Sequence, residues 1–285
     1  MRYYAPLRYP GGKASLGQYM RQVFVDNGIL DGVYVEPYAG GAAIGMELLM
    51  TGYAKEVWLN DIDPAVHAFW QAALNHSTEL IERVRSVPLT IREWRRQRSI
   101  YLARTESATV DLGFSALYLN RTNRSGILNG GVIGGLKQRG KWLIDARFNR
   151  TTIEERLRRV AQYRHRIRVT CSDAEQFLRD LTLPKRALIY IDPPYYQNGQ
   201  RLYRNSYQPP DHARVASYVQ RRLRHRWIVS YDDAPAVAEL YAKRRQLRYS
   251  LQYSAQEKKK GGELLVFSDG LRLPPTRDPG RYRVN

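Results

Sequence analysis

The chain has 285 residues, enough to bury a substantial core as one large domain or as a domain that carries an insertion. Lysine and arginine number 46 against 27 aspartates and glutamates, a formal charge of +19 that indicates a polyanionic partner. The bland alternative is a basic protein that its charge keeps soluble. The single cysteine, Cys171, excludes an intrachain disulfide and a cysteine-based zinc cluster, and no apolar stretch has the length of a signal peptide or a membrane span. We therefore expect a cytoplasmic protein with no membrane partner.

The first predicted unit is a strand, a glycine turn and a helix. An apolar run at residues 33–36 leads into Pro37-Tyr38-Ala39-Gly40-Gly41 and then into a helix-like segment at residues 42–50. A second apolar run at residues 56–59 ends in Asn60-Asp61-Ile62-Asp63. This acidic turn lies about 20 residues beyond the glycines, as in nucleotide-binding βαβ units.

The next part of the chain departs from this alternation. Helix-like segments are followed by a stretch dense in glycine and basic residues at 121–147. We predict that residues 67–162 form an inserted, mainly helical domain, while residues 1–66 and 163–285 form the domain that holds the sheet.

Five more strands are predicted, at residues 167–171, 187–191, 227–231, 248–253 and 263–267, with amphipathic segments between most of them. The connection between the last two is too short for a crossover helix, so they should pair as an antiparallel hairpin. The expected fold is α/β, with a seven-stranded, mostly parallel sheet that contains one antiparallel strand.

The sharpest motif is Asp192-Pro193-Pro194-Tyr195, directly after the strand predicted at residues 187–191. Ligands of open α/β sheets bind beyond the carboxyl ends of such strands. An exocyclic amine on a heteroaromatic ring is a poor nucleophile, and two acceptors aimed at its hydrogens favour its nucleophilic form. Asp192 and the Pro193 carbonyl can be those acceptors, while Tyr195 offers a face to an extruded base. Taken alone, the motif is as well explained by a strand that ends in a proline turn with an exposed tyrosine.

The turn Glu36-Pro37-Tyr38-Ala39-Gly40-Gly41 indicates a small nucleoside ligand. Glycine allows a ligand to approach the backbone closely, and the absent G-x-G-x-x-G spacing argues against a pyrophosphate. S-adenosylmethionine is such a nucleoside. Asp61 can accept hydrogen bonds from ribose hydroxyls, or it can cap the following helix.

Two further segments complete the candidate cofactor site. In the opening loop Arg8-Tyr9-Pro10-Gly11-Gly12-Lys13, Lys13 could meet the carboxylate of a methionine moiety and Tyr9 could pack on the cofactor. Asp173 could accept from the adenine amine of the cofactor, or merely cap the helix that follows it.

In this order the motifs resemble the Dam-type (alpha-group) adenine DNA methyltransferases over nearly the whole chain. The segments 9–13, 36–41, 60–63 and 192–195 carry the resemblance, together with Leu119-Asn120-Arg121-Thr122-Asn123-Arg124-Ser125-Gly126 and the Phe148-Asn149 pair. Tyr9 stands where tryptophan is common, and Gly40-Gly41 replaces a Gly-x-Gly arrangement. Residues 127–136 differ more, so Dam's target sequence is not transferred to this chain.

The resemblance implies a Rossmann-like class I methyltransferase that uses S-adenosylmethionine, needs no metal, and flips an adenine out of double-stranded DNA to methylate its N6 amine. A cognate restriction endonuclease would be a further partner. The expected catalytic residues are Asp192, Pro193, Pro194 and Tyr195. The expected cofactor contacts are Tyr9, Lys13, Glu36, Pro37, Tyr38, Gly40, Asp61, Ile62, Asp173 and Asp192. The expected DNA contacts are Asn120, Arg121, Asn123, Arg124, Arg139 and Lys141, because phosphates supply affinity and arginine also reads guanine edges.

Three alternatives share part of this pattern. An RNA adenine methyltransferase would have the same sheet and cofactor, but the large basic insertion favours duplex DNA. A protein glutamine methyltransferase typically has asparagine in place of Asp192, and its substrate does not explain the charge. A catalytically silent DNA-binding protein would have lost suitable residues from the cofactor loops, which this chain retains.

Overall fold

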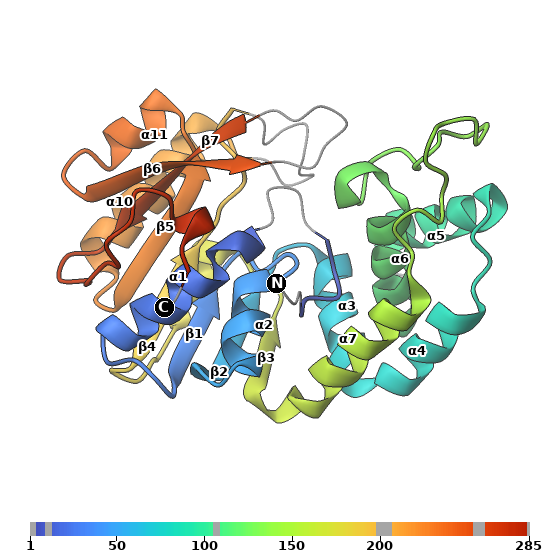
Figure 1. Cartoon of the computed structure of the whole chain (residues 1–285), viewed down its shortest axis with the longest axis horizontal. Coiled ribbons are helices and arrows are strands. Elements are labelled where there is room, and N and C mark those ends of the chain that lie inside the picture. The colour runs from blue at the N-terminus through green and yellow to red at the C-terminus, as the bar shows by residue number, and fades with distance from the viewer. Residues whose placement is uncertain (1–3, 9–12, 105–108, 198–206, 253–259, 284–285) are drawn as a thin grey trace.

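The sheet is the centre of the fold (Figure 1). The computed structural model describes residues 4–8, 13–104, 109–197, 207–252 and 260–283. In these residues the strands are β1 (Gly32–Glu36), β2 (Ala54–Asn60), β3 (Ile167–Thr170), β4 (Ala187–Ile191), β5 (Arg226–Asp232), β6 (Arg245–Gln252) and β7 (Lys260–Phe267).

The strand order is β3-β2-β1-β4-β5-β7-β6, and among these described strands β7 alone runs opposite to the other six. The predicted seven-stranded, mostly parallel sheet with one reversed strand is therefore confirmed, as is the hairpin between the last two strands. The chain moves outward from β1 through β2 to β3 and then returns to the other side of β1 to form β4. Loops after β1 and β4 thus lie next to each other at a topological switch point, where α/β sheets bind their ligands.

Helices cover both faces of the sheet, which explains why β1 and β4 are buried along their whole length. Val33 and Val35 face a core that includes side chains of α8, α10 and α11, whereas Tyr34 faces α1 and α2. No helix in the described part of the chain is both long and apolar enough to span a membrane. The helices are α1 (Gly17–Asp26), α2 (Ala43–Met50), α3 (Pro64–Asn75), α4 (Ser77–Ser86), α5 (Ile91–Ala103), α6 (Thr109–Thr122), α7 (Arg150–Gln162), α8 (Ala174–Asp180), α10 (Pro209–Arg222) and α11 (Pro235–Leu240).

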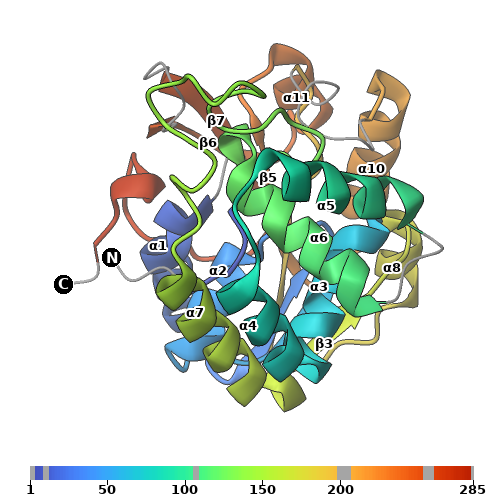
Figure 2. The ribbon, with the colours of Figure 1, turned by 90° about the vertical axis from the view of Figure 1, so that its right-hand side faces the viewer.

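The helices α3 to α7 lie between β2 and β3 in sequence, and Figure 2 shows α4, α5, α6 and α7 on the side of the molecule away from β6 and β7. Their buried side chains, such as Trp94 and Leu117, belong to the same apolar cluster as Tyr34 on the sheet. Residues 67–162 are thus mainly helical up to residue 126 and again in α7. Their separation from the rest of the chain as a domain stays a prediction.

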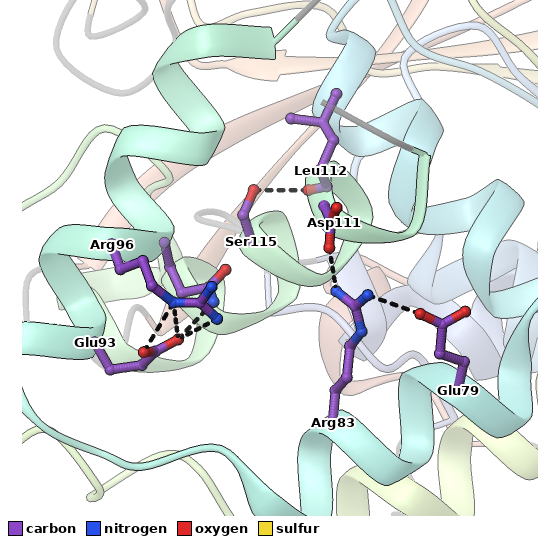
Figure 3. Close-up of polar contacts among 8 residues, drawn as sticks. Glu79, Arg83, Glu93, Arg96, Asp111, Leu112 and Ser115 are labelled. Atoms are coloured by element: carbon purple, nitrogen blue, oxygen red, sulfur yellow. Dashed lines mark hydrogen bonds and ion pairs between the residues drawn. The ribbon is translucent and has the colours of Figure 1, made fainter. Parts of the chain in front are cut away.

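Ion pairs form both within and between helices of this region (Figure 3). Arg83 on α4 donates to Asp111 on α6 at 2.5 Å and to Glu79 one turn earlier at 2.7 Å. On α5, Glu93 pairs with Arg96 at 3.0 Å. Each pair has at least one exposed side chain, so these ion pairs add little to the stability that apolar burial provides, and only the pair of Arg83 with Asp111 links two helices.

Close packing of α6 on α3 depends on Gly113. A Cβ at this position would lie 2.5 Å from the carbonyl oxygen of Ala68. We expect Gly113→Ala to lower the free energy of unfolding by about 1–3 kcal/mol, because the two helices must separate to admit the methyl group. Urea unfolding measures this loss. Gly131→Ala is the control, since a Cβ there meets nothing within 4 Å; equal losses in both variants would contradict the packing argument.

Candidate functional site

Acidic side chains gather at the carboxyl edge of the sheet. Glu36 and Asp232 end β1 and β5, whereas Asp61 and Asp192 directly follow β2 and β4. Because these four strands run parallel and neighbour one another, their ends meet along a single edge. The strand order therefore brings together carboxylates that are up to 196 positions apart in sequence.

The buried amide of Asn60 joins the loops that follow β1, β2 and β3. Its Nδ2 donates to the carbonyl oxygens of Pro37 at 3.0 Å and Ser172 at 2.9 Å, and its Oδ1 accepts from the Ser172 amide at 3.1 Å. The side chain is fully buried. The sequence showed Asn60 only as part of a turn, and its position as the link between three loops depends on the sheet order.

Asp61 connects the end of β2 to the glycine turn. Its Oδ2 accepts from the Gly40 amide at 2.9 Å, and its Oδ1 accepts from the Asp63 amide, also at 2.9 Å. The cap of α3 is Asp63, which accepts from the Ala65 amide, so the alternative role of Asp61 as that cap does not hold. Burial raises the pKa of Asp61 to about 6. Each carboxylate oxygen has a second lone pair, so both can still accept from ribose hydroxyls.

Three other residues predicted to contact the cofactor, Asp173, Glu36 and Tyr38, bind different groups of the protein. Asp173 caps α8 by accepting from the amides of Glu175 and Gln176, which supports its alternative role. Burial raises the pKa of Glu36 to about 8, and its Oε1 accepts from the Gly45 amide. The Tyr38 hydroxyl pairs with that of Tyr207 at 2.9 Å.

A cationic nucleoside fits this edge. Carboxylates at the ends of β1, β2 and β4 match a ligand with ribose hydroxyls, an amino group and a positively charged sulfur. Ile62 is 46% exposed beside Asp61, so its side chain is accessible at this edge, and its contact with a base stays a prediction. Among the described residues, no group of three or more histidine, cysteine or acidic side chains is arranged to hold a metal ion. Tyr9 lies outside the described residues.

The catalytic candidate Asp192 is held beside a buried lysine. Its Oδ1 lies 3.6 Å from Nζ of Lys13, and its side chain is 28% exposed. Burial raises the pKa of Asp192 to about 6, although Lys13 opposes the shift. Asp232, at the end of β5, fixes the loop that continues from Asp192 to Gln197. Its two oxygens accept from the amides of Tyr196 at 2.8 Å and Gln197 at 2.9 Å.

Lys13 and Tyr195 are placed differently from what the sequence predicted. Lys13 begins the short helix η1 (Lys13–Leu16), is 4% exposed, and donates to Oε2 of Glu263 at 2.6 Å. Its ammonium thus binds protein carboxylates, and a contact with the carboxylate of a methionine moiety is not part of this arrangement. Tyr195 is 6% exposed and donates to Oε1 of Glu263 at 2.9 Å, so its ring does not form the exposed face that we expected.

Glu263 and Asp232 are site residues that the sequence analysis missed. They pair across β5 and β7, and because β7 is antiparallel, its early residue Glu263 reaches the edge where the parallel strands end. Glu263 is fully buried. One signal was available: Glu263 is a charged residue that opens an otherwise apolar run in the predicted reversed strand.

Three of the six residues predicted to contact DNA are buried in the protein, and the other three are exposed. Asn120, Arg121 and Asn123 are buried, and their side chains bind protein groups. Asn120 binds the backbone of Arg8 at both its amide and its carbonyl oxygen, and Arg121 donates to the carbonyl oxygen of Pro6. Asn120 and Arg121 thus fix the start of the opening loop, whereas Asn123 accepts from the Trp94 indole and donates to the backbone of Ile127 and Leu128. The expectation of direct DNA contact is therefore corrected for all three. Burial lowers the pKa of Arg121 to about 9, in keeping with this enclosed position.

The other three candidates, Arg124, Arg139 and Lys141, are exposed. Arg124 lies in the short helix η3 (Arg124–Gly126) and lines a groove of about 570 Å³ between α5 and the loop that follows η3. Arg95 and Arg98 of α5 line the same groove, and the Arg98 guanidinium lies 5.5 Å from the ring centre of Trp94. The groove therefore combines cationic groups with apolar side chains.

The sheet order defines a Rossmann-like α/β protein, a class whose ligands bind at the switch point of the sheet. The chain belongs to the family of D12 class N6 adenine-specific DNA methyltransferases, which it matches over residues 9–256. The resemblance to adenine DNA methyltransferases is thereby confirmed, and family membership implies the use of S-adenosylmethionine.

Individual proteins are more distantly similar. The Type II methyltransferase M.MjaIII of Methanocaldococcus jannaschii is 24% identical over 175 residues, which are 57% of this chain and 58% of that protein. Two solved structures also align. One is a candidate RNA methyltransferase, PH1948 of Pyrococcus horikoshii (11% identity, TM-score 0.42, covering 92% of this chain and 86% of that one). The other is a candidate class I S-adenosylmethionine-dependent methyltransferase of Listeria monocytogenes (10% identity, TM-score 0.40, covering 93% and 63%).

Asn60→Ala should disturb the cofactor edge as a whole. Without the amide, the carbonyl oxygens of Pro37 and Ser172 lose a buried donor, and we expect the free energy of unfolding to fall by at least about 2 kcal/mol. Affinity for S-adenosylmethionine, measured by calorimetry at a temperature where the variant is folded, should fall by about tenfold or more, since a loss of about 1.4 kcal/mol already has that effect. Asn75→Ala, on exposed helix surface, is the control; equal affinities in the two variants would remove Asn60 from the site.

Proposed function

We propose that this protein transfers a methyl group from S-adenosylmethionine to the N6 amine of adenine in double-stranded DNA. The observation that carries the proposal is the position of Asp192 at the switch point of a sheet in this family. Its side chain is 28% exposed at this edge, and the Pro193 carbonyl follows directly. The Lys13 ammonium and the Ser230 hydroxyl both stabilise the charged form of the carboxylate from inside the protein. Two acceptors are thus available at the place where the family of this chain methylates an amine.

The residues of this chain orient the amine and draw electron density toward its nitrogen. Asp192 and the Pro193 carbonyl accept its two hydrogens, which favours a localised lone pair. S-adenosylmethionine, when bound, supplies a methyl group activated by the sulfonium and becomes a neutral thioether. The methylated nitrogen then loses one proton, for which the Asp192 carboxylate is an adjacent acceptor.

Base flipping follows from the geometry of duplex DNA, because a stacked adenine cannot reach an amine site at a protein edge. We propose that the base enters the edge between the loops after β1 and β4. Stacking on Tyr195 would require its buried ring to leave Glu263, so this contact remains a proposal of the family resemblance. Partnership with a restriction endonuclease also remains a proposal.

Transfer of labelled methyl from S-adenosylmethionine to unmethylated duplex DNA, with nucleoside analysis of the product, tests the reaction. N6-methyladenine is the expected product, and sequencing of the modified positions would give the recognition sequence. Label in RNA or in protein in place of DNA would overturn the proposal.

Asp192→Ala should abolish methyl transfer and leave DNA affinity within about twofold, because the carboxylate binds the reacting amine and not the phosphates. We expect turnover to fall by about 10²-fold or more, the cost of removing one group that binds the reacting atoms. Single-turnover kinetics and fluorescence anisotropy measure the two quantities. Asp180→Ala, at an exposed position on α8, is the control. Unchanged turnover in Asp192→Ala would refute the proposed role.

We further propose that the groove lined by Arg95, Arg98 and Arg124 holds the DNA backbone, and that Arg139 and Lys141 extend this surface. Its cations are exposed and close together, whereas the buried Arg121 is not available. Phosphate contacts of this kind supply most of the affinity for duplex DNA and release counterions.

The double variant Arg98→Ala/Arg124→Ala should bind all duplex sequences more weakly. If each arginine contacts one phosphate, the slope of log K against log salt should become less steep by about 1 for each residue. Binding titrations between about 50 and 200 mM salt measure the slope. The control Arg221→Ala/Arg222→Ala, on exposed surface of α10, removes two positive charges elsewhere and should leave the slope unchanged. Equal effects of the groove and control variants would show that only net charge matters.

A further inference from the structure

The two oxygens of the buried Glu263 carboxylate accept hydrogen bonds from two different segments of the site. Oε2 accepts from Nζ of Lys13 at 2.6 Å, and Oε1 accepts from the Tyr195 hydroxyl at 2.9 Å. Lys13 also donates to the Tyr195 hydroxyl at 3.2 Å. The opening loop, the catalytic loop and β7 are thus joined by one fully buried side chain.

Lys13 lies between two carboxylates at unequal distances. Its Nζ is 2.6 Å from Glu263 but 3.6 Å from Asp192. A buried ammonium must pair with an anion, because an unpaired buried charge is costly. A short ion pair with Asp192 would neutralise much of the negative charge that attracts the adenine amine, whereas the longer separation of 3.6 Å leaves more of that charge uncompensated.

We propose that Glu263 is a positioning residue for methyl transfer, which binds the Lys13 ammonium and thereby leaves the Asp192 carboxylate open to the target amine. The inference rests on the proposed function and extends it to a residue on β7. Glu263 acts through Lys13 and does not itself touch the substrate. Its bond to Tyr195 fixes the end of the catalytic tetrapeptide at the same time.

The charges around Asp192 agree with this role. Burial raises the pKa of Asp192 to about 6, Lys13 opposes the shift, and the negative charge of Glu263 adds to it. Lys13 itself is buried, which alone would lower its pKa, but Asp192 and Glu263 outweigh burial and raise it well above its ordinary value. Other titratable groups near this cluster are Tyr34, Glu36, Tyr190, Tyr195, Tyr231, Asp232 and Tyr249.

Glu263→Gln tests the proposal by removing charge with little change of shape. The proposed role of Asp192 requires its ionised form, so kcat/KM of the wild-type protein should fall as the pH drops through about 6. In Glu263→Gln the acid limb should move to lower pH, because the negative charge that raises the pKa of Asp192 is removed and Asp192 becomes the carboxylate partner of the ammonium. At pH 8, kcat should fall by about tenfold to hundredfold, the scale of a small displacement in an active site, while KM for DNA changes less than kcat. The control is Glu239→Gln, at an exposed position in the last turn of α11.

Lys13→Met supplies a second and opposite test. Removing the ammonium should move the acid limb to higher pH, since Asp192 loses the cation that favours its charged form. In the double variant Lys13→Met/Glu263→Gln, the loss of kcat caused by the glutamine should be smaller than in the wild-type background. Shifts in the same direction for both single variants, or fully additive effects on kcat, would overturn the proposal.

A readout independent of activity separates this inference from the proposed function. The pKa of Asp192 in the free protein can be followed by NMR of labelled carboxyl carbons and assigned with Asp192→Asn. It should decrease in Glu263→Gln and increase in Lys13→Met. A wild-type protein that methylates no DNA would refute the proposed function only, whereas an unmoved Asp192 titration in both folded variants would refute the role of Glu263 whatever the substrate.

Discussion

The pairing of β1 with β4 is the constraint on which the site depends. Val35 lies opposite Ile189 in this parallel pair, while the other edge of β1 pairs with β2. This single choice of neighbours reverses the direction of winding and places Glu36 and Asp192 at adjacent strand ends. The buried, apolar character of both strands makes the pairing stable, and their parallel direction brings the polar residues at their carboxyl ends to the edge where α/β sheets bind ligands.

The sequence predicts those parts of the molecule that depend on local pattern. Apolar runs followed by glycine or acidic residues marked the strands, and a connection too short for a helix marked the reversed strand β7. The exact roles of side chains were harder, because they depend on contacts between distant segments. Asp61 and Asp63 both resemble helix caps in the sequence, and only the folded loop shows that Asp63 is the cap while Asp61 binds the glycine turn.

The sequence analysis misplaced functional residues mainly where charged side chains are buried in the protein. Arg121 looks like a DNA contact beside Arg124, yet it donates to the backbone of Pro6 inside the protein. Arg156 and Arg166 likewise donate to backbone carbonyl oxygens, of Ala5 and Ala54 respectively, at 3.0 Å. Part of the net charge of +19 therefore belongs to arginines that bind the chain itself. A count of basic residues indicates the kind of partner but cannot locate the surface that meets it.

The contact between Lys13 and Glu263 also has a consequence for how the protein matures on the ribosome. The two residues are separated by 250 positions, so Glu263 is synthesised only after almost the entire chain that follows Lys13. The tether of Arg8 to Asn120 becomes available much earlier, after 112 further residues. Synthesis thus allows the amino-terminal segment to dock on the helical region first, and the acid–base cluster of the site is completed only when β7 joins the sheet. A truncated or stalled chain that lacks β7 would carry Asp192 and Lys13 without the residue that keeps them apart.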